Sequence, residues 1–424
     1  MIGLYLWMAL IVVEISLFYM TFKANRFRYR LNRNASILSI ALIIMMMTSG
    51  IITWSFRYYG LLIVLLIMGI MNHKNSLRSS DELKPYTYKL SGVKTIFRGV
   101  ILTAMMIPSM IFPEYKPVET SGRYTVQTTQ LTIVDNQRIE TFSNQNDFRT
   151  LNVLVYYPEN VDALLPLVVY SHGGISLTTS NDSLFLELAS HGYVVFSIGH
   201  PYHTIVTKST EGKNIWINST YMQELSRENA TENPEESFVL YQQWMQLRSD
   251  DINSVINYTK AQVEKHDNPF IFSIIDIENI ALAGHSLGGS AALCVGRENA
   301  DIQAIIALES PYMCDILGVA DGQFIIDESA YPKPVLNIYS DSTWDRLSIL
   351  PQYKQNNLML ENNESTVVNR YIDGTGHFSL TDLSLTSPII TRILNGFPAK
   401  RKAKEVLQII NEETLEFLDI YLKK

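Results

Sequence analysis

A serine flanked by two glycines is the feature of this sequence that most directly indicates chemistry. Residues 280–292 read IALAGHSLGGSAA, so an apolar, strand-like run leads into the Ser286 pentapeptide GHSLG, and a helix-compatible run of small residues follows. This is the strand–turn–helix setting of a nucleophile elbow, a tight turn that exposes a serine Oγ. Gly284 and Gly288 leave out the side chains that would collide in such a turn. The pattern predicts a nucleophile at Ser286.

A serine hydroxyl is a weak nucleophile near neutral pH, so it needs a base and a group that orients the base. In enzymes with this elbow, the order along the chain is serine, acid, histidine. Of the eight histidines, only His377 follows Ser286. It lies in the loop DGTGHF, directly after an apolar run. His377 is therefore the candidate base.

Two acidic residues fit the remaining position. Glu309 directly follows the apolar run 304–308, and Asp341 lies just after the run 335–339. Both would lie at the carboxyl ends of buried strands, where a sheet of parallel strands gathers its site. Either could accept a hydrogen bond from His377 and stabilise the imidazolium.

The tetrahedral intermediate of ester hydrolysis needs donors aimed at its oxyanion. The backbone N–H of Leu287, directly after the nucleophile, is one candidate. The turn HGG that follows the run 165–170 offers a second at Gly174, because glycine lets a backbone approach the substrate closely. We interpret three histidines nearby as structural or pocket-rim residues: His172, His200 and His203.

Strands and helices that could carry these side chains alternate along residues 114–424. Residues 124–134 and 150–157 alternate like antiparallel strands, with Asn136-Gln137 as the turn between them. A short continuous apolar run, typical of a strand buried on both faces, follows at 165–170, and further strands are expected at 193–198, about 280, 302–308, 335–339 and 367–372. Helices are expected at 181–191, 238–263, after the elbow and at about 401–422. The alternation predicts an α/β fold, a mostly parallel sheet with helices on both faces. Residues 204–236 are polar without a clear period, which predicts a lid or insertion.

The first 113 residues differ in kind from the rest. They carry a net charge of +9, whereas residues 114–424 carry −17. Apolar runs at 1–22, 35–55, 58–71 and 95–113 have lengths at or near those needed to cross a bilayer, the third being the shortest. We expect a membrane region of about four helices over residues 1–113 and a catalytic domain over residues 114–424.

Lysine and arginine gather in two segments, 23–34 and 72–94, which predicts that both face the cytoplasm. Four spans then place the N-terminus and everything after residue 113 outside. The expected protein is a multi-pass protein of the cell membrane with an extracytoplasmic catalytic domain. Within the spans, we expect Glu14 to face the bundle interior and Arg98 to extend toward the inner surface.

Composition excludes several other classes. The acidic catalytic part argues against nucleic acid as a partner, because phosphate neutralisation needs a basic surface. Cys294 and Cys314 are too few for a metal cluster or a disulfide framework. We interpret them as buried free thiols, with a single disulfide as the alternative outside the cytoplasm. No metal or organic cofactor is expected.

Five blocks resemble the platelet-activating factor acetylhydrolase family in its plasma or type II form. They are SHGG, LASHGYVVFSIGHP, GHSLGGSAAL, IIALESP and GTGHFSLTDL, in the family's order within about residues 150–390. The resemblance implies a Ser-acid-His α/β-hydrolase that cleaves short or oxidised acyl chains from phospholipids without calcium. It implies that the acid lies in IIALESP, at Glu309, where the family typically has aspartate, and that Leu287 and Gly174 are the oxyanion donors. The four-span region is not part of the family pattern.

We therefore expect a membrane-anchored serine esterase that acts on an ester or phospholipid substrate. Its triad would be Ser286, His377 and Glu309, with Asp341 as the alternative acid. A general short-chain carboxylesterase acting on soluble esters is the alternative within enzymes. A non-catalytic membrane sensor or scaffold that uses the hydrolase fold is the alternative of another class, and an intact elbow argues against it.

Overall fold

The chain folds into two units, one made mainly of long apolar helices and the other built around a sheet of short strands. One comprises Met1–Lys116 with Leu385–Ile390, and the other comprises Pro117–Ser384 with Thr391–Lys424. The computed structural model describes residues 2–20, 25–78, 87–144, 146–231, 233–265, 269–362 and 365–423. Parts of the two predicted basic loops, residues 21–24 and 79–86, lie outside the described residues.

The first unit contains four helices that are long and apolar enough to cross a membrane. They are α1 (Ile2–Met20), α2 (Asn25–Thr48), α3 (Phe56–Leu77) and α4 (Tyr88–Ile111). Helix α3 extends past the predicted run 58–71 because Asn72 and Ser76 are buried inside the unit. Arg98, which was expected to extend toward the inner surface, contacts polar side chains of α1 and α3. Its Nη1 lies 3.6 Å from Glu14 Oε2, and its Nη2 donates to Asn72 Oδ1 at 3.3 Å.

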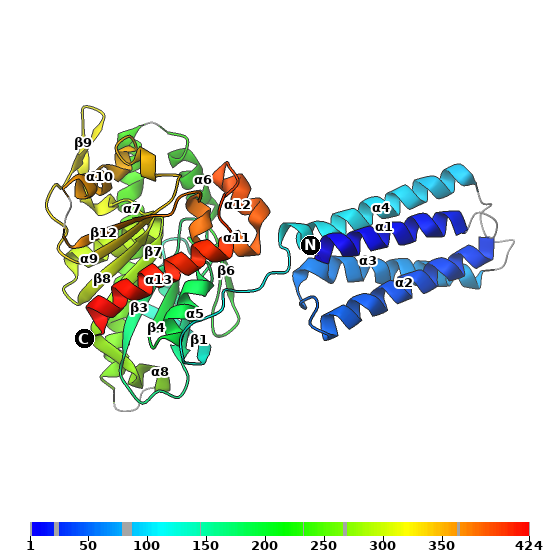
Figure 1. Ribbon diagram of the computed structural model, residues 1–424, viewed down its shortest axis with the longest axis horizontal. Helices are drawn as coiled ribbons and strands as arrows, with labels where there is room; N and C mark the ends of the chain where they lie inside the picture. The colour runs from blue at the N-terminus through cyan, green and yellow to red at the C-terminus, as the bar shows by residue number, and fades with distance from the viewer. Residues whose placement is uncertain are drawn as a thin grey trace. The chain divides into compact units, whose positions relative to one another are not determined.

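An eight-stranded sheet forms the centre of the second unit, in the order β1-β2-β4-β3-β7-β8-β11-β12 (Figure 1). The strands are β1 (Val126–Ile139), β2 (Phe148–Pro158), β3 (Leu165–Ser171), β4 (Val194–Gly199), β7 (Ile275–His285), β8 (Ile302–Leu308), β11 (Val335–Tyr339) and β12 (Val367–Tyr371). The pairs β1–β2 and β2–β4 are antiparallel and the remaining pairs are parallel. Strands β3, β4 and β11 are buried along their whole length, which accounts for their mostly apolar sequences.

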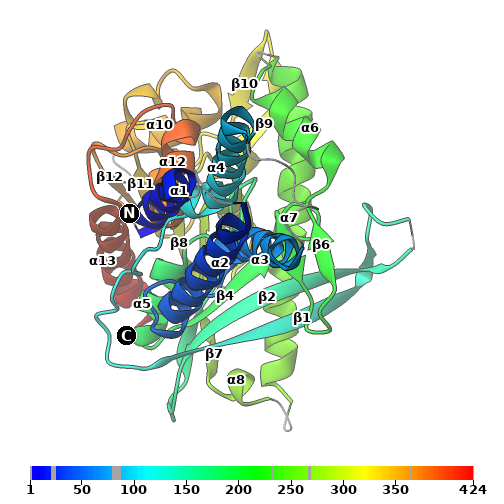
Figure 2. The same ribbon diagram turned by 90° about the vertical axis from the view of Figure 1, so that its right-hand side faces the viewer.

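Helices cover both faces of this sheet. Helix α5 (Asp182–Ser190) packs with α13 (Ala403–Leu422) on one face, and α7 (Pro234–Val263) packs with α9 (Leu287–Glu298) on the other. Figure 2 shows α5 and α13 on one side of the strands and α7 on the opposite side. The expected fold class is confirmed: a mostly parallel sheet with helices on both faces, preceded by long apolar helices.

The first hairpin differs from its prediction. The expected turn at Asn136-Gln137 is wrong, because β1 continues to Ile139. The pairing shifts register between Asp135 and Ile139, so the polar pair sits in an irregularity of the strand. Asp135 Oδ1 accepts a hydrogen bond from the Gln137 N–H at 3.0 Å, which stabilises this local distortion.

The polar segment 204–236 has regular structure of its own. It contains a short hairpin, β5 (Val206–Lys208) and β6 (Asn214–Trp216), followed by α6 (Ser219–Glu228). The Asn218 side chain caps α6 by accepting from two backbone amides. A lid function for this segment remains a prediction.

The two cysteines are paired. Cys294 of α9 and Cys314, in the 3₁₀ turn Met313–Asp315, form a disulfide with a Cα–Cα separation of 5.4 Å. The interpretation as free thiols is therefore wrong, and the alternative of a single disulfide holds.

Candidate active site

The nucleophile elbow lies between β7 and α9. Ser286 has φ 54° and ψ −128°, a strained conformation for a residue with a side chain, and its N–H donates to Leu308 O of β8 at 2.9 Å. A Cβ on Gly284 would lie 2.4 Å from Gly288 C, and a Cβ on Gly288 would lie 2.0 Å from Ser171 O. Only glycine fits at these two positions, and this close packing holds the strained serine in place.

The turn after β3 lies against this elbow. A Cβ on Gly173 would lie 3.6 Å from Ser286 Cβ, and a Cβ on Gly174 would lie 3.1 Å from Leu287 Cδ1. The Leu287 N–H is the first amide of α9, and the first amides of a helix have no partner within it. The fold thus brings the two expected oxyanion donors, Leu287 and Gly174, beside the expected nucleophile.

His377 begins the 3₁₀ turn that follows β12, and its imidazole faces Glu309. The distance from His377 Nδ1 to Glu309 Oε2 is 3.3 Å. Glu309 directly follows β8 and is fully buried. Ser340 Oγ lies 2.8 Å from its Oε1 and 2.7 Å from its Oε2, so its one proton bridges the two oxygens, and Thr343 Oγ1 donates to Oε1. These donors hold the carboxylate in one orientation, with Oε2 directed at the imidazole.

Asp341, the alternative acid, has different partners. Its Oδ1 accepts from Tyr371 Oη at 2.7 Å and from the Gly374 N–H at 2.9 Å, and its own N–H donates to Thr375 O at 3.0 Å. The hydrogen bond to Asp341 raises the pKa of Tyr371 to about 12. Asp341 therefore fixes the loop that carries His377, whereas Glu309 contacts the imidazole.

Three contributing residues escaped the sequence analysis. His285, the second residue of the pentapeptide, has its Nε2 3.1 Å from His377 O, with the two rings 4.4 Å apart. Burial lowers the pKa of His285 well below its ordinary value, so the neutral ring donates this hydrogen bond. Its position inside the motif was the available signal. Ser340 and Thr343 carried none, because small hydroxyl residues near a strand end are common.

His172, in the turn after β3, and His200, which contacts the end of that strand, are both buried. His172 Nε2 is 2.6 Å from Thr204 Oγ1, and His200 Nε2 is 2.8 Å from Ser171 Oγ. His200 Nδ1 lies 2.9 Å from Asp251 Oδ2. Burial lowers the pKa of His172 well below its ordinary value and that of His200 to about 4. Both rings are therefore neutral near pH 7, and their contacts suit the structural interpretation.

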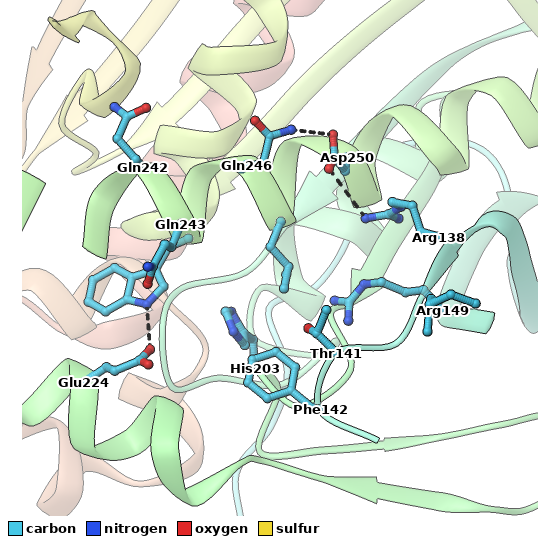
Figure 3. Close-up of a pocket in the computed structure, with 13 residues that line it drawn as sticks. Arg138, Thr141, Phe142, Arg149, His203, Glu224, Gln242, Gln243, Gln246 and Asp250 are labelled. Atoms are coloured by element: carbon cyan, nitrogen blue, oxygen red, sulfur yellow. Dashed lines mark hydrogen bonds and ion pairs between the residues drawn. The ribbon is translucent and has the colours of Figure 1, made fainter. Parts of the chain in front are cut away.

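A pocket of about 720 Å³ lies beside the first hairpin, α6 and α7 (Figure 3). It is lined by side chains of the first hairpin, α6 and α7 and by His203, among them Arg138, Phe142, Glu224, Gln243 and Trp244. Two of these lining residues are joined by a hydrogen bond, in which Trp244 Nε1 donates to Glu224 Oε2 at 3.2 Å. Ser286, His377 and Glu309 are absent from its lining, so the expected triad does not form this pocket.

Comparison with solved structures identifies the fold. A ferulic acid esterase from Streptomyces cinnamoneus superimposes with a TM-score of 0.54 at 21% sequence identity, over 73% of this chain and 94% of the esterase. At that identity the likeness concerns the fold alone.

Comparison with known sequences identifies the family. Platelet-activating factor acetylhydrolases of Bos taurus and Cavia porcellus are 22% identical over 278 residues and 24% identical over 272 residues. Each match covers 61% of this chain and 57% of the relative, so the chain spans little more than half the length of these relatives. Residues 150–424 match the family model described as platelet-activating factor acetylhydrolase, isoform II. The chain therefore belongs to this family of carboxylic ester hydrolases.

Proposed function

We propose that this chain is a serine esterase in which Ser286 is the nucleophile, His377 the base and Glu309 the residue that orients the base. The observation that carries the proposal is the 3.3 Å approach of His377 Nδ1 to Glu309 Oε2, on the same sheet edge as the elbow. Because Nδ1 faces the carboxylate, Nε2 is the nitrogen left to accept a proton from Ser286 Oγ.

The reaction proceeds in two steps. Ser286 Oγ attacks the ester carbonyl while His377 takes its proton, and the Leu287 and Gly174 amides bind the oxyanion. The ester C–O bond then breaks, His377 returns the proton to the departing alcohol, and an acyl-enzyme remains. In the second step His377 takes a proton from water, which attacks the carbonyl of the acyl-enzyme. The bond to Ser286 Oγ then breaks, His377 returns the proton to Oγ, and the carboxylic acid is released. The side chains of the triad and the two backbone amides supply the nucleophile, the base and the oxyanion donors that this chemistry needs.

For the substrate we propose a phospholipid with a short or oxidised acyl chain, cleaved without calcium. Membership of the acetylhydrolase family supports this class of ester. The four long apolar helices support a membrane-anchored enzyme, since they would hold the hydrolase unit near lipid.

For the location we propose the cell membrane, with the hydrolase unit outside the cytoplasm. Two observations support this orientation. Basic residues gather in the segments 23–34 and 72–94, which favours a cytoplasmic position for both. The Cys294–Cys314 disulfide is a type of bond that persists in oxidising compartments.

The test uses the full chain in detergent micelles. A fluorophosphonate probe should label the wild type and leave Ser286→Ala unlabelled. The wild type should then be assayed on phospholipids with an acetyl, an oxidised or a palmitoyl chain at sn-2, and on soluble p-nitrophenyl butyrate, each with and without EDTA. Preference for the acetyl and oxidised lipids supports the proposal. Preference for the soluble ester would identify a general carboxylesterase, and absence of labelling would favour a non-catalytic sensor or scaffold.

A further inference from the structure

A fully buried arginine of α7 lies directly behind the turn that carries Gly174. The exposed fraction of Arg248 is 0%. Its Nη1 donates to His172 O at 2.5 Å, and its Nη2 lies 3.3 Å from Gly173 O. The guanidinium thus contacts two successive carbonyls of one short turn.

This arginine lacks the partner that a buried charge usually has. None of the ion pairs among the described residues includes Arg248, and its Nε has no hydrogen-bond partner there. The neighbouring carboxylate of Asp251, three residues along α7, is taken by Arg149, Arg138 and His200. A buried charge without a counterion is costly to a fold, so stability alone gives no reason for an arginine here.

The geometry of the peptide bond gives such a reason. In a trans peptide the C=O and the following N–H point in opposite directions. When Arg248 holds the Gly173 carbonyl, the Gly174 N–H must point away from the guanidinium. In this proposal the Gly174 N–H faces the elbow, whose Leu287 packs against Gly174. The cation also polarises the peptide group, which makes its N–H a stronger donor.

Tyr221 of α6 completes this support. It is fully buried, its hydroxyl donates to Gly174 O at 3.0 Å, and its ring stacks on His203 at 3.6 Å. Arg248 Nη2 lies 3.4 Å from the same hydroxyl. The backbone carbonyls of residues 172, 173 and 174 therefore all accept hydrogen bonds from Arg248 or Tyr221.

The charges around this arginine fit the same role. Burial and the nearby Arg248 cation both lower the pKa of His172 and of His203, and burial lowers that of His200 to about 4. The three rings are neutral near pH 7, so the guanidinium is the cation closest to the turn's carbonyls. Its field extends to the oxyanion as well.

We propose that Arg248 is a positioning residue of the oxyanion hole, which aims and polarises the Gly174 N–H while Tyr221 restrains the next peptide. The inference rests on the proposed esterase function. It predicts that loss of Arg248 weakens binding of the transition state and leaves binding of the ground-state ester nearly unchanged.

The test compares Arg248→Met, Arg248→Lys and Tyr221→Phe in the full chain with the wild type. For Arg248→Met we expect kcat to fall on the order of 10²-fold with KM within about threefold, as when one oxyanion donor is lost. Affinity for a trifluoromethyl ketone, whose adduct forms an oxyanion, should fall by the same factor as kcat/KM. Arg248→Lys keeps the charge but offers a single point of attachment, so it should recover part of the loss.

Arg149→Met is the matched control. Arg149 is also a buried arginine, but it contacts the carboxylates of Asp251 and Glu140 rather than the turn. Its loss should lower Tm without a selective fall in kcat of the folded enzyme, whereas Arg248→Met should keep Tm, since it removes an uncompensated charge. Wild-type kcat and ketone affinity in Arg248→Met would overturn the proposal while leaving the esterase function standing.

An inactive, unlabelled wild type would instead overturn the esterase function itself. If Arg248→Met does not fold, Arg248→Lys and Tyr221→Phe decide. A fall of kcat of about tenfold in Tyr221→Phe, with KM and Tm unchanged, supports the restraint of the turn. Wild-type kcat in both variants contradicts it.

Discussion

Replacing Glu309 with glutamine exchanges one carboxylate oxygen for an NH₂ group among fixed donors. The hydroxyls of Ser340 and Thr343 can rotate, but the Ser340 backbone N–H, 3.4 Å from Oε1, can only donate. The amide oxygen should therefore take the Oε1 position. Its NH₂ group then faces His377 Nδ1, which lies 3.3 Å from Oε2.

This arrangement forces the wrong tautomer on the base. Nδ1 must accept from the amide, so the proton moves to Nε2, which can no longer accept one from Ser286. We expect kcat to fall by about 10³- to 10⁴-fold, or ~4–5.5 kcal/mol of transition-state stabilisation, the size known for an acid-to-amide change in a serine protease triad. KM should change little, because Glu309 is fully buried and does not face the substrate.

Steady-state kinetics of the full chain on a short-chain ester measures this effect, with Tm as the check on folding. Asp341→Asn is the matched control, since its remaining oxygen can still accept from Tyr371 and Gly374. It should cost less than about tenfold in kcat. The orienting role of Glu309 is refuted if Glu309→Gln keeps more than about a tenth of the wild-type kcat, or if Asp341→Asn is the more damaging change.

Three further outcomes are expected. Ser286→Ala should lower kcat on the order of 10³-fold or more with Tm retained; a residual activity above about a tenth would refute the role of the elbow. A topology reporter fused after residue 120 should be active only outside the cytoplasm and one near residue 80 only inside, and the reverse pattern would contradict the orientation. Burial raises the pKa of Asp182 to about 7. Between about pH 4 and pH 7 the folded state therefore keeps a proton on Asp182 that the unfolded state has released, so the free energy of unfolding should fall as the pH rises through this range. Asp182→Asn should therefore raise the free energy of unfolding by about 4 kcal/mol at pH 8 and leave it unchanged near pH 3; an equal effect at both pH values, measured by denaturant titration, would contradict the shift.

The sequence predicted those features that burial or chain order dictates. Strands β3, β4 and β11 are covered on both faces, so they are mostly apolar and their runs are visible without an alignment. The choice of His377 as the candidate base followed from elimination, since no other histidine lies downstream of Ser286. The choice between Glu309 and Asp341 could not be made from position alone, because both follow strands on the same edge.

Features that depend on tertiary contacts were not predictable. The pairing of Cys294 with Cys314 requires that α9 and a distant turn approach to a Cα–Cα distance of 5.4 Å, which no local pattern reports. Asn136-Gln137 has the composition of a turn, yet pairing with β2 carries β1 past it. Arg248 is one polar residue among many on a long helix. Its proposed role depends on its contact with the turn after β3, which the sequence does not show.

The contact between Tyr221 and Gly174 has a consequence for how such chains can diverge. Surface insertions normally vary freely among homologues, because they can change length without disturbing the elements that they connect. Here Tyr221, a residue of the segment 204–236, donates a hydrogen bond to the backbone of the turn beside Ser286, the proposed nucleophile. A descendant that shortens this segment must at the same time find another group for the Gly174 carbonyl. The length of the insertion and the residues behind the turn should therefore change together in evolution, and a graft of this segment into a relative should succeed only when α7 is transferred with it.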